Sequence, residues 1–302
     1  MKKLIMTFCS ILLISTMLLT FPHLALASDS APIAENLELK TYCKVSTSGM
    51  LSAFDPDGGS VRFQITTQPV KGALSLSEDG AFTYTPQANK KGLDYFGYRA
   101  IDDEGKQSQE ATVIIRIMRQ KKEIRYADLQ GNGLEYPAVV LSELGLFTGR
   151  QICGTYCFEP GETVTRGEFL SMCMKLIGKP RYLGVWKTGY QDDEKIPSWQ
   201  KVYASTAAMH GIYQGFAENE GTRFDGDEIL SYAQAAAYLE RVLQLRNVSF
   251  LPGYERLDLR LTQACFREKE TELSGEVGRS EQPLTRADVA LMLSAATAYL
   301  EN

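Results

Sequence analysis

Hydrophobic and polar positions follow two different periods along the chain. Between residues 32 and 119 they alternate with a period of two, as Val61, Phe63 and Ile65 do. Beyond residue 124 the apolar positions recur with a period near 3.6. The charged segment 119–123, which has no apolar residue, separates the two patterns. The chain is therefore predicted to be multidomain, with an all-β domain at 28–119 and an all-α region after it.

The all-β stretch has the turn signals of a sandwich. Glu78-Asp79-Gly80 and the segment 102–105 each separate two alternating runs. About seven short strands with such turns in a domain of this length are typical of an immunoglobulin-like sandwich. The order of the strands is left open by the pattern.

The helical stretch repeats itself at a shift of 66 residues. The matching segments are 145–149 with 211–215, 158–162 with 224–228, and 165–168 with 231–234. A third, degraded copy ends at 285–288. We expect repeats at 124–180, 186–245 and 246–302, each a helix, a loop and a helix. A single copy cannot bury its apolar face alone, so the copies should pack as one unit.

Composition narrows the classes of function. The formal charge is −5, and without Lys2 and Lys3 it becomes 30 basic against 37 acidic residues, or −7. This balance argues against nucleic acid as a partner, because no broad positive field is available. The sequence has two histidines, His23 and His210, and no phosphate-binding glycine loop or nucleophile elbow. We therefore expect a protein that is not an enzyme.

The N-terminus has the pattern of an export signal. Lys2 and Lys3 precede an apolar run, 4–21, and Ala25-Leu26-Ala27 has the small residues of a cleavage site. Residues 1–27 are predicted to be a signal peptide, and an uncleaved membrane anchor is the alternative. After cleavage we expect no membrane attachment and a secreted protein at the cell surface.

The second helix of the first copy and that of the third each start with an arginine that capping does not explain. Thr165 and Glu168 form a capping box that accounts for helix initiation. Arg166 and Arg286 instead place a cation near the positive end of the helix dipole, which is unfavourable. An anion held jointly by the helix start and the guanidinium would compensate. The alternative is that each arginine pairs with a nearby surface carboxylate.

The region 124–302, which contains these residues, resembles S-layer homology repeats. The matching features are Tyr126-Ala127-Asp128, Tyr190-Gln191-Asp192, the Gly-x-x-x-Gly turns and the Thr-Arg-x-acid helix starts, and they are weakest at the front of the third copy. The resemblance implies an all-α pseudo-trimer that binds anionic secondary cell-wall polysaccharide of Gram-positive bacteria, often through a pyruvylated sugar. The binding positions that it carries over are Asp128, Gly149, Arg166, Asp192, Trp199 and Arg286.

Two of these positions have alternative interpretations. Trp199 can stack on a sugar ring or can belong to the core. Gly149 can allow a ligand to approach the backbone closely or can simply form a turn. Tyr232 stands where the second copy would have its arginine, so one or two good pockets are expected.

The β domain resembles bacterial cadherin-like and Ig-like surface modules. The segments that carry the likeness are Asp55-Pro56-Asp57-Gly58, 80–86 and 92–98. The resemblance implies a spacer or adhesive unit, and some such modules bind calcium. The calcium candidates are Asp55, Asp57, Asp102 and Asp103, whose alternative role is to form turns. Apart from this calcium, no cofactor is expected.

Cysteine usage leaves one question open. Five cysteines follow the signal, so they cannot all pair within one chain. Cys153 and Cys157 flank a short loop, and whether they form a disulfide is not decided by the sequence.

Taken together, the patterns predict a non-enzymatic protein of a Gram-positive cell wall that displays an Ig-like module and is anchored non-covalently to wall polysaccharide. The alternative is an adhesin whose Ig-like domain binds a protein or glycan of a host or neighbouring cell, with the repeats serving only as structure.

Overall fold

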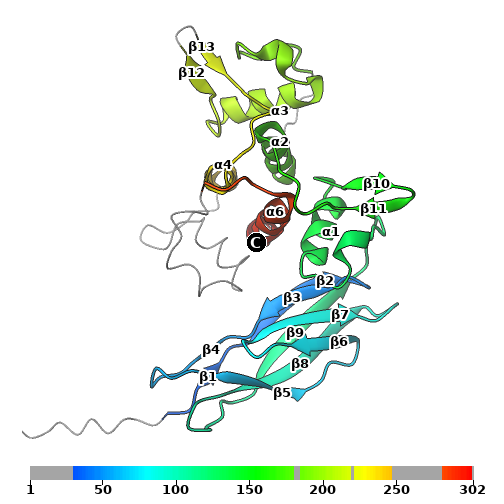
Figure 1. The fold of residues 1–302 in the computed structure, drawn as a ribbon, viewed down its shortest axis with the longest axis vertical. Coiled ribbons are helices and arrows are strands. Elements are labelled where there is room, and N and C mark those ends of the chain that lie inside the picture. The colour runs from blue at the N-terminus through cyan, green and yellow to red at the C-terminus, as the bar shows by residue number, and fades with distance from the viewer. Residues whose placement is uncertain (1–29, 180–183, 219–220, 247–280, 301–302) are drawn as a thin grey trace, which may run out of the picture.

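The computed structural model describes residues 30–179, 184–218, 221–246 and 281–300. A β-sandwich lies at one end of the molecule and a helical region at the other (Figure 1). The predicted signal peptide, Cys265 and the front of the predicted third repeat lie outside the described residues.

Two sheets make up the sandwich. One has the order β2-β9-β8-β5 and the other β3-β7-β6, and a short β1-β4 pair lies beside them. The strands are β1 Ile33–Ala34, β2 Leu37–Tyr42, β3 Thr47–Met50, β4 Ala53–Phe54, β5 Arg62–Thr67, β6 Gly72–Leu76, β7 Ala81–Pro86, β8 Gly92–Ile101 and β9 Ala111–Met118. β2 runs parallel to β9, and the other pairings are antiparallel. The described part of this domain thus has nine strands, where the sequence predicted about seven.

The core of the sandwich follows the predicted alternation. In β9, Val113 and Ile115 are fully buried and Ile114 between them is exposed. Asp94 is also buried, and its carboxylate accepts a hydrogen bond from the Tyr84 hydroxyl at 2.7 Å. Burial, followed by this contact with Asp94, raises the pKa of Tyr84, so the hydroxyl stays a donor.

The second region is mixed α/β, so the prediction of an all-α fold was wrong. Five α-helices lie in its described part: α1 Glu135–Glu143, α2 Arg166–Leu176, α3 Ser198–Met209, α4 Tyr232–Gln244 and α6 Arg286–Leu300. The short 3₁₀ helices are η1 Ala127–Leu129 and η2 Asp193–Lys195. Two hairpins join the helices: β10 Arg150–Ile152 with β11 Thr155–Cys157, and β12 Phe216–Glu218 with β13 Gly221–Arg223. Periodicity missed the hairpins because each strand has three residues.

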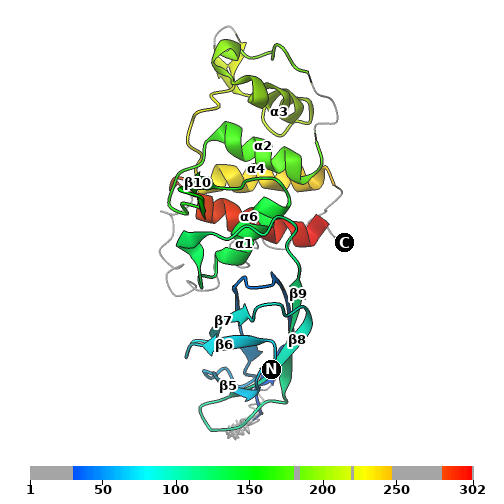
Figure 2. The ribbon, with the colours of Figure 1, turned by 90° about the vertical axis from the view of Figure 1, so that its right-hand side faces the viewer.

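Three equivalent segments meet at the centre of the helical region. The Val164 N–H donates to the Leu284 carbonyl at 2.9 Å, Leu284 to Leu230 at 2.7 Å, and Leu230 to Val164 at 3.3 Å. This closed ring lies just before α2, α4 and α6, which pack side by side (Figure 2). α1 packs on α6, and α3 packs on α2. The segments therefore have a pseudo-threefold arrangement.

The sandwich contacts the start of α1. The backbone N–H of Ser46 donates to the Glu135 carboxylate at 3.0 Å, and Glu135 is 1% exposed. The rings of Tyr42 and Tyr136 lie 5.9 Å apart, and Val45 belongs to the hydrophobic core of the helical region. The two regions thus share a small packed junction. In the residues described, no helix combines the length and the apolar character needed to cross a membrane.

Candidate functional site

Capping boxes start the equivalent helices and set the position of the arginines. At α2, the Thr165 side chain accepts from the Glu168 N–H, and the Glu168 carboxylate accepts from the Thr165 N–H at 3.0 Å. Ser231 and Gln234 form the same reciprocal pair at α4. The capping box predicted at Thr165 and Glu168 is thus confirmed, and α4 has the same arrangement. Arg166 and Tyr232 are each the first residue of their helix.

Arg166 is seated on the second copy and is closed to solvent. Its Nη1 donates to the carbonyl oxygens of Phe224, at 3.1 Å, and Asp225. The guanidinium carbon lies 5.1 Å from the centre of the Tyr213 ring and 4.9 Å from that of Phe216. With only 2% of its surface exposed, Arg166 links two repeats and is covered by aromatic rings.

Arg286 has the same position on α6 and is seated on the first copy. Its Nη1 donates to the Phe158 carbonyl at 3.2 Å and to the Glu159 carboxylate at 2.8 Å. The guanidinium carbon lies 5.1 Å from the centre of the Phe147 ring. Its side chain keeps 19% of its surface exposed, so Arg286 remains accessible.

Asp128 and Asp192 shape the loops that receive these arginines. The Asp128 carboxylate accepts from the backbone N–H groups of Phe158, at 2.9 Å, and Glu159, at 2.7 Å. Asp192 accepts from the equivalent N–H groups of Phe224 and Asp225, at 2.8 and 2.9 Å. Each carboxylate therefore satisfies two backbone donors within its own repeat.

Gly149 also has a structural role, because the backbone of the hairpin approaches it closely. Its φ is +76°, and a Cβ there would lie 2.4 Å from the Cys157 carbonyl oxygen. The turn interpretation of Gly149 thus fits the structure, because only glycine allows the two strands of the hairpin to meet here.

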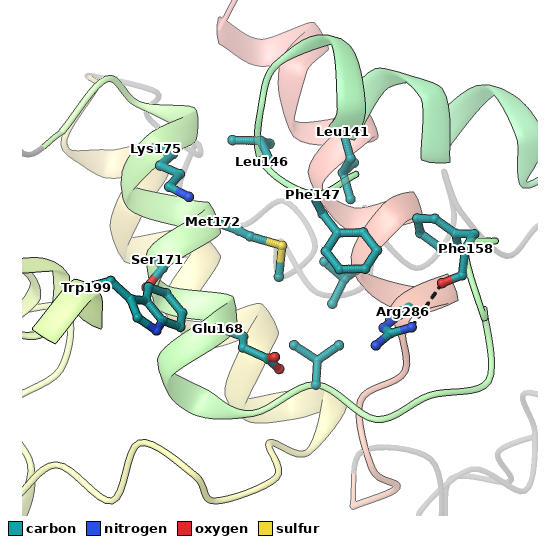
Figure 3. Close-up of a pocket in the computed structure, with 12 residues that line it drawn as sticks. Leu141, Leu146, Phe147, Phe158, Glu168, Ser171, Met172, Lys175, Trp199 and Arg286 are labelled. Atoms are coloured by element: carbon teal, nitrogen blue, oxygen red, sulfur yellow. Dashed lines mark hydrogen bonds between the residues drawn. The ribbon is translucent and has the colours of Figure 1, made fainter. Parts of the chain in front are cut away.

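A hollow of about 160 Å³ opens beside Arg286. α2 forms one wall, α6 and the loop after α1 form the other, and Trp199 of α3 lies at the edge (Figure 3). The lining residues are Leu141, Leu146, Phe147, Phe158, Val164, Glu168, Ser171, Met172, Lys175, Trp199, Arg286 and Val289. We call this hollow the Arg286 pocket.

The pocket brings together two of the residues singled out by sequence. Trp199 and Arg286 both line it, whereas Asp128, Gly149, Arg166 and Asp192 do not. Trp199 is 52% exposed, so the alternative placement in the core does not hold. A binding role for each of the six residues stays a prediction.

Sequence reasoning missed Lys175, whose ammonium group faces the pocket from α2 (Figure 3). Its Nζ also lies 5.5 Å from the centre of the Tyr203 ring. Glu168, Ser171 and Lys175 follow each other at spacings of three and four residues, which place them on one helix face. That spacing could have indicated a polar helix face that includes Lys175, but the capping box already explained Glu168. The pocket thus combines two cations, one carboxylate, three aromatic side chains and several aliphatic ones.

Two of the calcium candidates, Asp55 and Asp102, act as turn formers in the sandwich. The Asp55 carboxylate accepts from the backbone N–H groups of Asp57, at 2.9 Å, and Gly59, at 3.1 Å. Asp102 accepts from the Lys106 N–H at 2.8 Å, and Asp103 from the Ser60 hydroxyl at 2.8 Å. Within the described ranges, no three His, Cys, Asp or Glu side chains are grouped so as to hold a metal ion. The contacts of Asp55 and Asp102 favour the turn interpretation for these two residues.

Cys153 and Cys157 are free thiols in this structure. Cys157 lies opposite Arg150 in the hairpin, while Cys153 lies in its turn with a φ of +49°. The hairpin therefore separates the two sulfurs instead of pairing them.

Comparison with known protein families assigns the sandwich. Residues 28–119 match the bacterial cadherin-like domain family. They form a bacterial cadherin-like domain. Such domains are typical of bacterial surface and adhesin proteins. The predicted resemblance of this part of the chain is thus confirmed, whereas the predicted S-layer homology of the helical region is not shown.

Two similar solved structures each match about a third of the chain. The SrpA adhesin R347E mutant from Streptococcus sanguinis is 19% identical, over 32% of this chain and 63% of that chain, with a TM-score of 0.26. Drosophila N-cadherin EC1-4 is 14% identical, over 30% and 25% of the two chains, with a TM-score of 0.25. The match thus spans less than two thirds of either structure. None of the curated proteins compared with the chain matches it.

Proposed function

We propose that this protein is a non-enzymatic component of a Gram-positive cell surface whose helical region binds anionic wall polysaccharide in the Arg286 pocket. The observation that carries the proposal is the meeting of Trp199 and Arg286, from different helices, at one hollow. The cadherin-like domain would then be displayed outward from the wall.

The chemistry of the pocket suits one acidic sugar. An exposed indole offers a flat apolar face for a sugar ring, and a guanidinium pairs well with a carboxylate such as that of a pyruvyl group. Lys175 adds a second cation on the opposite wall. A volume of about 160 Å³ is below the usual range for drug-sized ligands, so the pocket fits a single terminal sugar unit better than a long stretch of polymer.

The central ring of hydrogen bonds supports the proposed relationship to S-layer homology repeats. Val164, Leu230 and Leu284 make equivalent contacts, as three related repeats would. In the first two copies, Asp128 and Asp192 also bind equivalent loops. On this proposal, 124–302 is the anchoring region.

Sedimentation with purified wall sacculi tests the proposal. We expect the full chain, without its signal peptide, to pellet with Gram-positive sacculi and not with sacculi stripped of secondary polysaccharide. Trp199→Ala and Arg286→Ala should each weaken binding about tenfold, which corresponds to about 1.4 kcal/mol.

Matched controls separate the pocket from general surface effects. Trp186 is 91% exposed and does not line the pocket, so Trp186→Ala should bind like wild type. Arg116, which pairs with Glu38 on the sandwich, is the control for Arg286. Equal binding by wild type and both pocket variants would overturn the proposed site, and an unbound wild type would overturn the function.

Adhesion through the cadherin-like domain is the second candidate. Its four-stranded sheet exposes Tyr95 directly opposite Ile114, with exposed fractions of 57% and 38%. Leu93, 52% exposed, lies two residues away on the same strand. A full chain with Tyr95→Ser and Ile114→Thr should then lose attachment to animal cells but keep attachment to sacculi. Unchanged cell attachment would remove this candidate.

A further inference from the structure

We propose that Glu159 is a built-in counter-ion that occupies Arg286 until an acidic group of the ligand displaces it. Glu159 would thereby set the preference of the pocket for acidic over neutral glycans. The inference rests on the proposed function of the Arg286 pocket and adds the residue that determines its selectivity.

One carboxylate contacts two cations at the edge of the pocket. Glu159 Oε2 lies 2.8 Å from Arg286 Nη1 and 3.4 Å from Arg150 Nε. The Glu159 side chain is 24% exposed and that of Arg150 is 62% exposed. Solvent, and hence a ligand, can reach this carboxylate.

Arg166, which starts α2 as Arg286 starts α6, is held against the second copy without pairing with its Asp225 carboxylate. Arg166 is held by the carbonyl oxygens of Phe224 and Asp225 and by two aromatic rings. The Asp225 carboxylate, at the position equivalent to Glu159, pairs instead with Arg223 at 2.7 Å. Both arginines donate to carbonyl oxygens of the neighbouring copy and lie against aromatic rings. The contact between Glu159 and Arg286 is additional to these shared contacts.

This difference has a consequence for binding. A neutral sugar cannot replace the carboxylate on Arg286, whereas an acidic group makes the same charge-assisted hydrogen bonds. When an acidic group of the ligand displaces Glu159 from Arg286, Arg150 can still pair with the Glu159 carboxylate. The displaced carboxylate is then not left without a cation. Every ligand must therefore displace Glu159 from Arg286. This requirement lowers the affinity of acidic ligands and prevents neutral ligands from binding.

The test compares Glu159→Gln with wild type, using the full chain without its signal peptide. The probes are secondary polysaccharide purified from sacculi and the same polysaccharide with its carboxyl groups reduced to alcohols. We expect wild type to bind only the acidic form. Glu159→Gln should bind that form about fivefold more tightly, in keeping with the removal of one partly exposed ion pair.

A matched control removes the same charge from the same loop. Glu162 lies three residues from Glu159 and does not line the pocket, so Glu162→Gln reports the effect of net charge alone. Glu159→Asp keeps the charge but shortens the side chain, and should also bind more tightly because its carboxylate reaches Arg286 less well. Circular dichroism melts establish that each variant is folded, and Glu159→Asp is the deciding variant if Glu159→Gln does not fold.

The possible results distinguish the counter-ion role of Glu159 from polysaccharide binding in the Arg286 pocket. If wild type binds and Glu159→Gln binds equally or less tightly, or if Glu162→Gln gives the same gain, the counter-ion role is overturned. A wild type that binds the carboxyl-reduced form as well as the acidic form also overturns it. If wild type binds neither form, the proposed function fails, and the inference fails with it.

Discussion

Arg166 and Arg286 occupy the same position at the start of equivalent helices, yet Arg286 lines the Arg286 pocket and Arg166 does not. The residues that cover them differ. Phe216 lies over Arg166, whereas Arg150 is its counterpart in the first copy. Tyr238 packs against Tyr213 with ring centres 5.5 Å apart, where the first copy has the slimmer Met172. Aromatic side chains therefore cover Arg166, where the first copy has an arginine and a methionine at the equivalent positions.

Arg166 should stabilise the fold more than Arg286 does. Arg166→Ala removes a buried guanidinium and leaves the Phe224 and Asp225 carbonyls without this donor. We expect a loss of about 2–4 kcal/mol in the free energy of unfolding. Arg286→Ala should cost less, because its side chain is partly exposed. Urea denaturation of the two variants measures the difference, and equal losses would contradict the structural role of Arg166.

Asp128 and Asp192 should contribute alike to stability. Each carboxylate accepts hydrogen bonds from two backbone N–H groups, so alanine at either position leaves two donors unpaired. We expect each alanine variant to lose about 1–3 kcal/mol. Asparagine keeps one acceptor oxygen and should lose less. Thermal melts compare the four variants, and a loss confined to one repeat would speak against their equivalence.

Acid should erase the contribution of Asp193. Its hydrogen bond from Lys201, followed by those from Thr188, holds the pKa of Asp193 well below its usual range. The native state then binds fewer protons than the unfolded chain, whose Asp pKa is about 3.9. The stabilisation is fully present above that value and is lost as the pH falls through the lower native pKa.

The corresponding experiment is a melting series of wild type and Asp193→Asn from pH 7 into acid. Asp193→Asn should melt lower than wild type at pH 7, and the gap should narrow below about pH 4. A gap that is constant with pH would show that the charge of Asp193 does not contribute. Asp227→Asn, which removes a carboxylate with an exposed position, is the control.

Glu135 should hold the two regions together. Glu135→Ala leaves the Ser46 N–H without its acceptor in the packed junction. We expect faster trypsin cleavage within 119–125, the segment rich in lysine and arginine between the regions. Glu135→Gln retains an acceptor oxygen and should be cleaved almost like wild type. Unchanged cleavage of Glu135→Ala would show that Tyr42 and Tyr136 hold the junction without it.

Part of the candidate site was predictable because its signals are local. The spacing of Thr165 and Glu168 predicts the capping box, and the shift of 66 residues predicts that Arg166 belongs to a repeated helix start. The hairpins were not predicted, because three-residue strands have no measurable period. Lys175 was not singled out either, since one lysine on an amphipathic helix has the pattern of an ordinary surface residue.

By itself, the sequence determined the β domain, the repeat and the positions of the arginines, because periodicity, capping and turn preferences act over a few residues. Only the tertiary structure decided which arginine is accessible. Arg166 is covered by rings from the second copy, while Arg286 faces Trp199 and Lys175 across an open pocket. The exposure of each arginine depends on side chains from segments that are distant in the sequence. A local sequence pattern does not show which of these side chains will be in contact or how large they are.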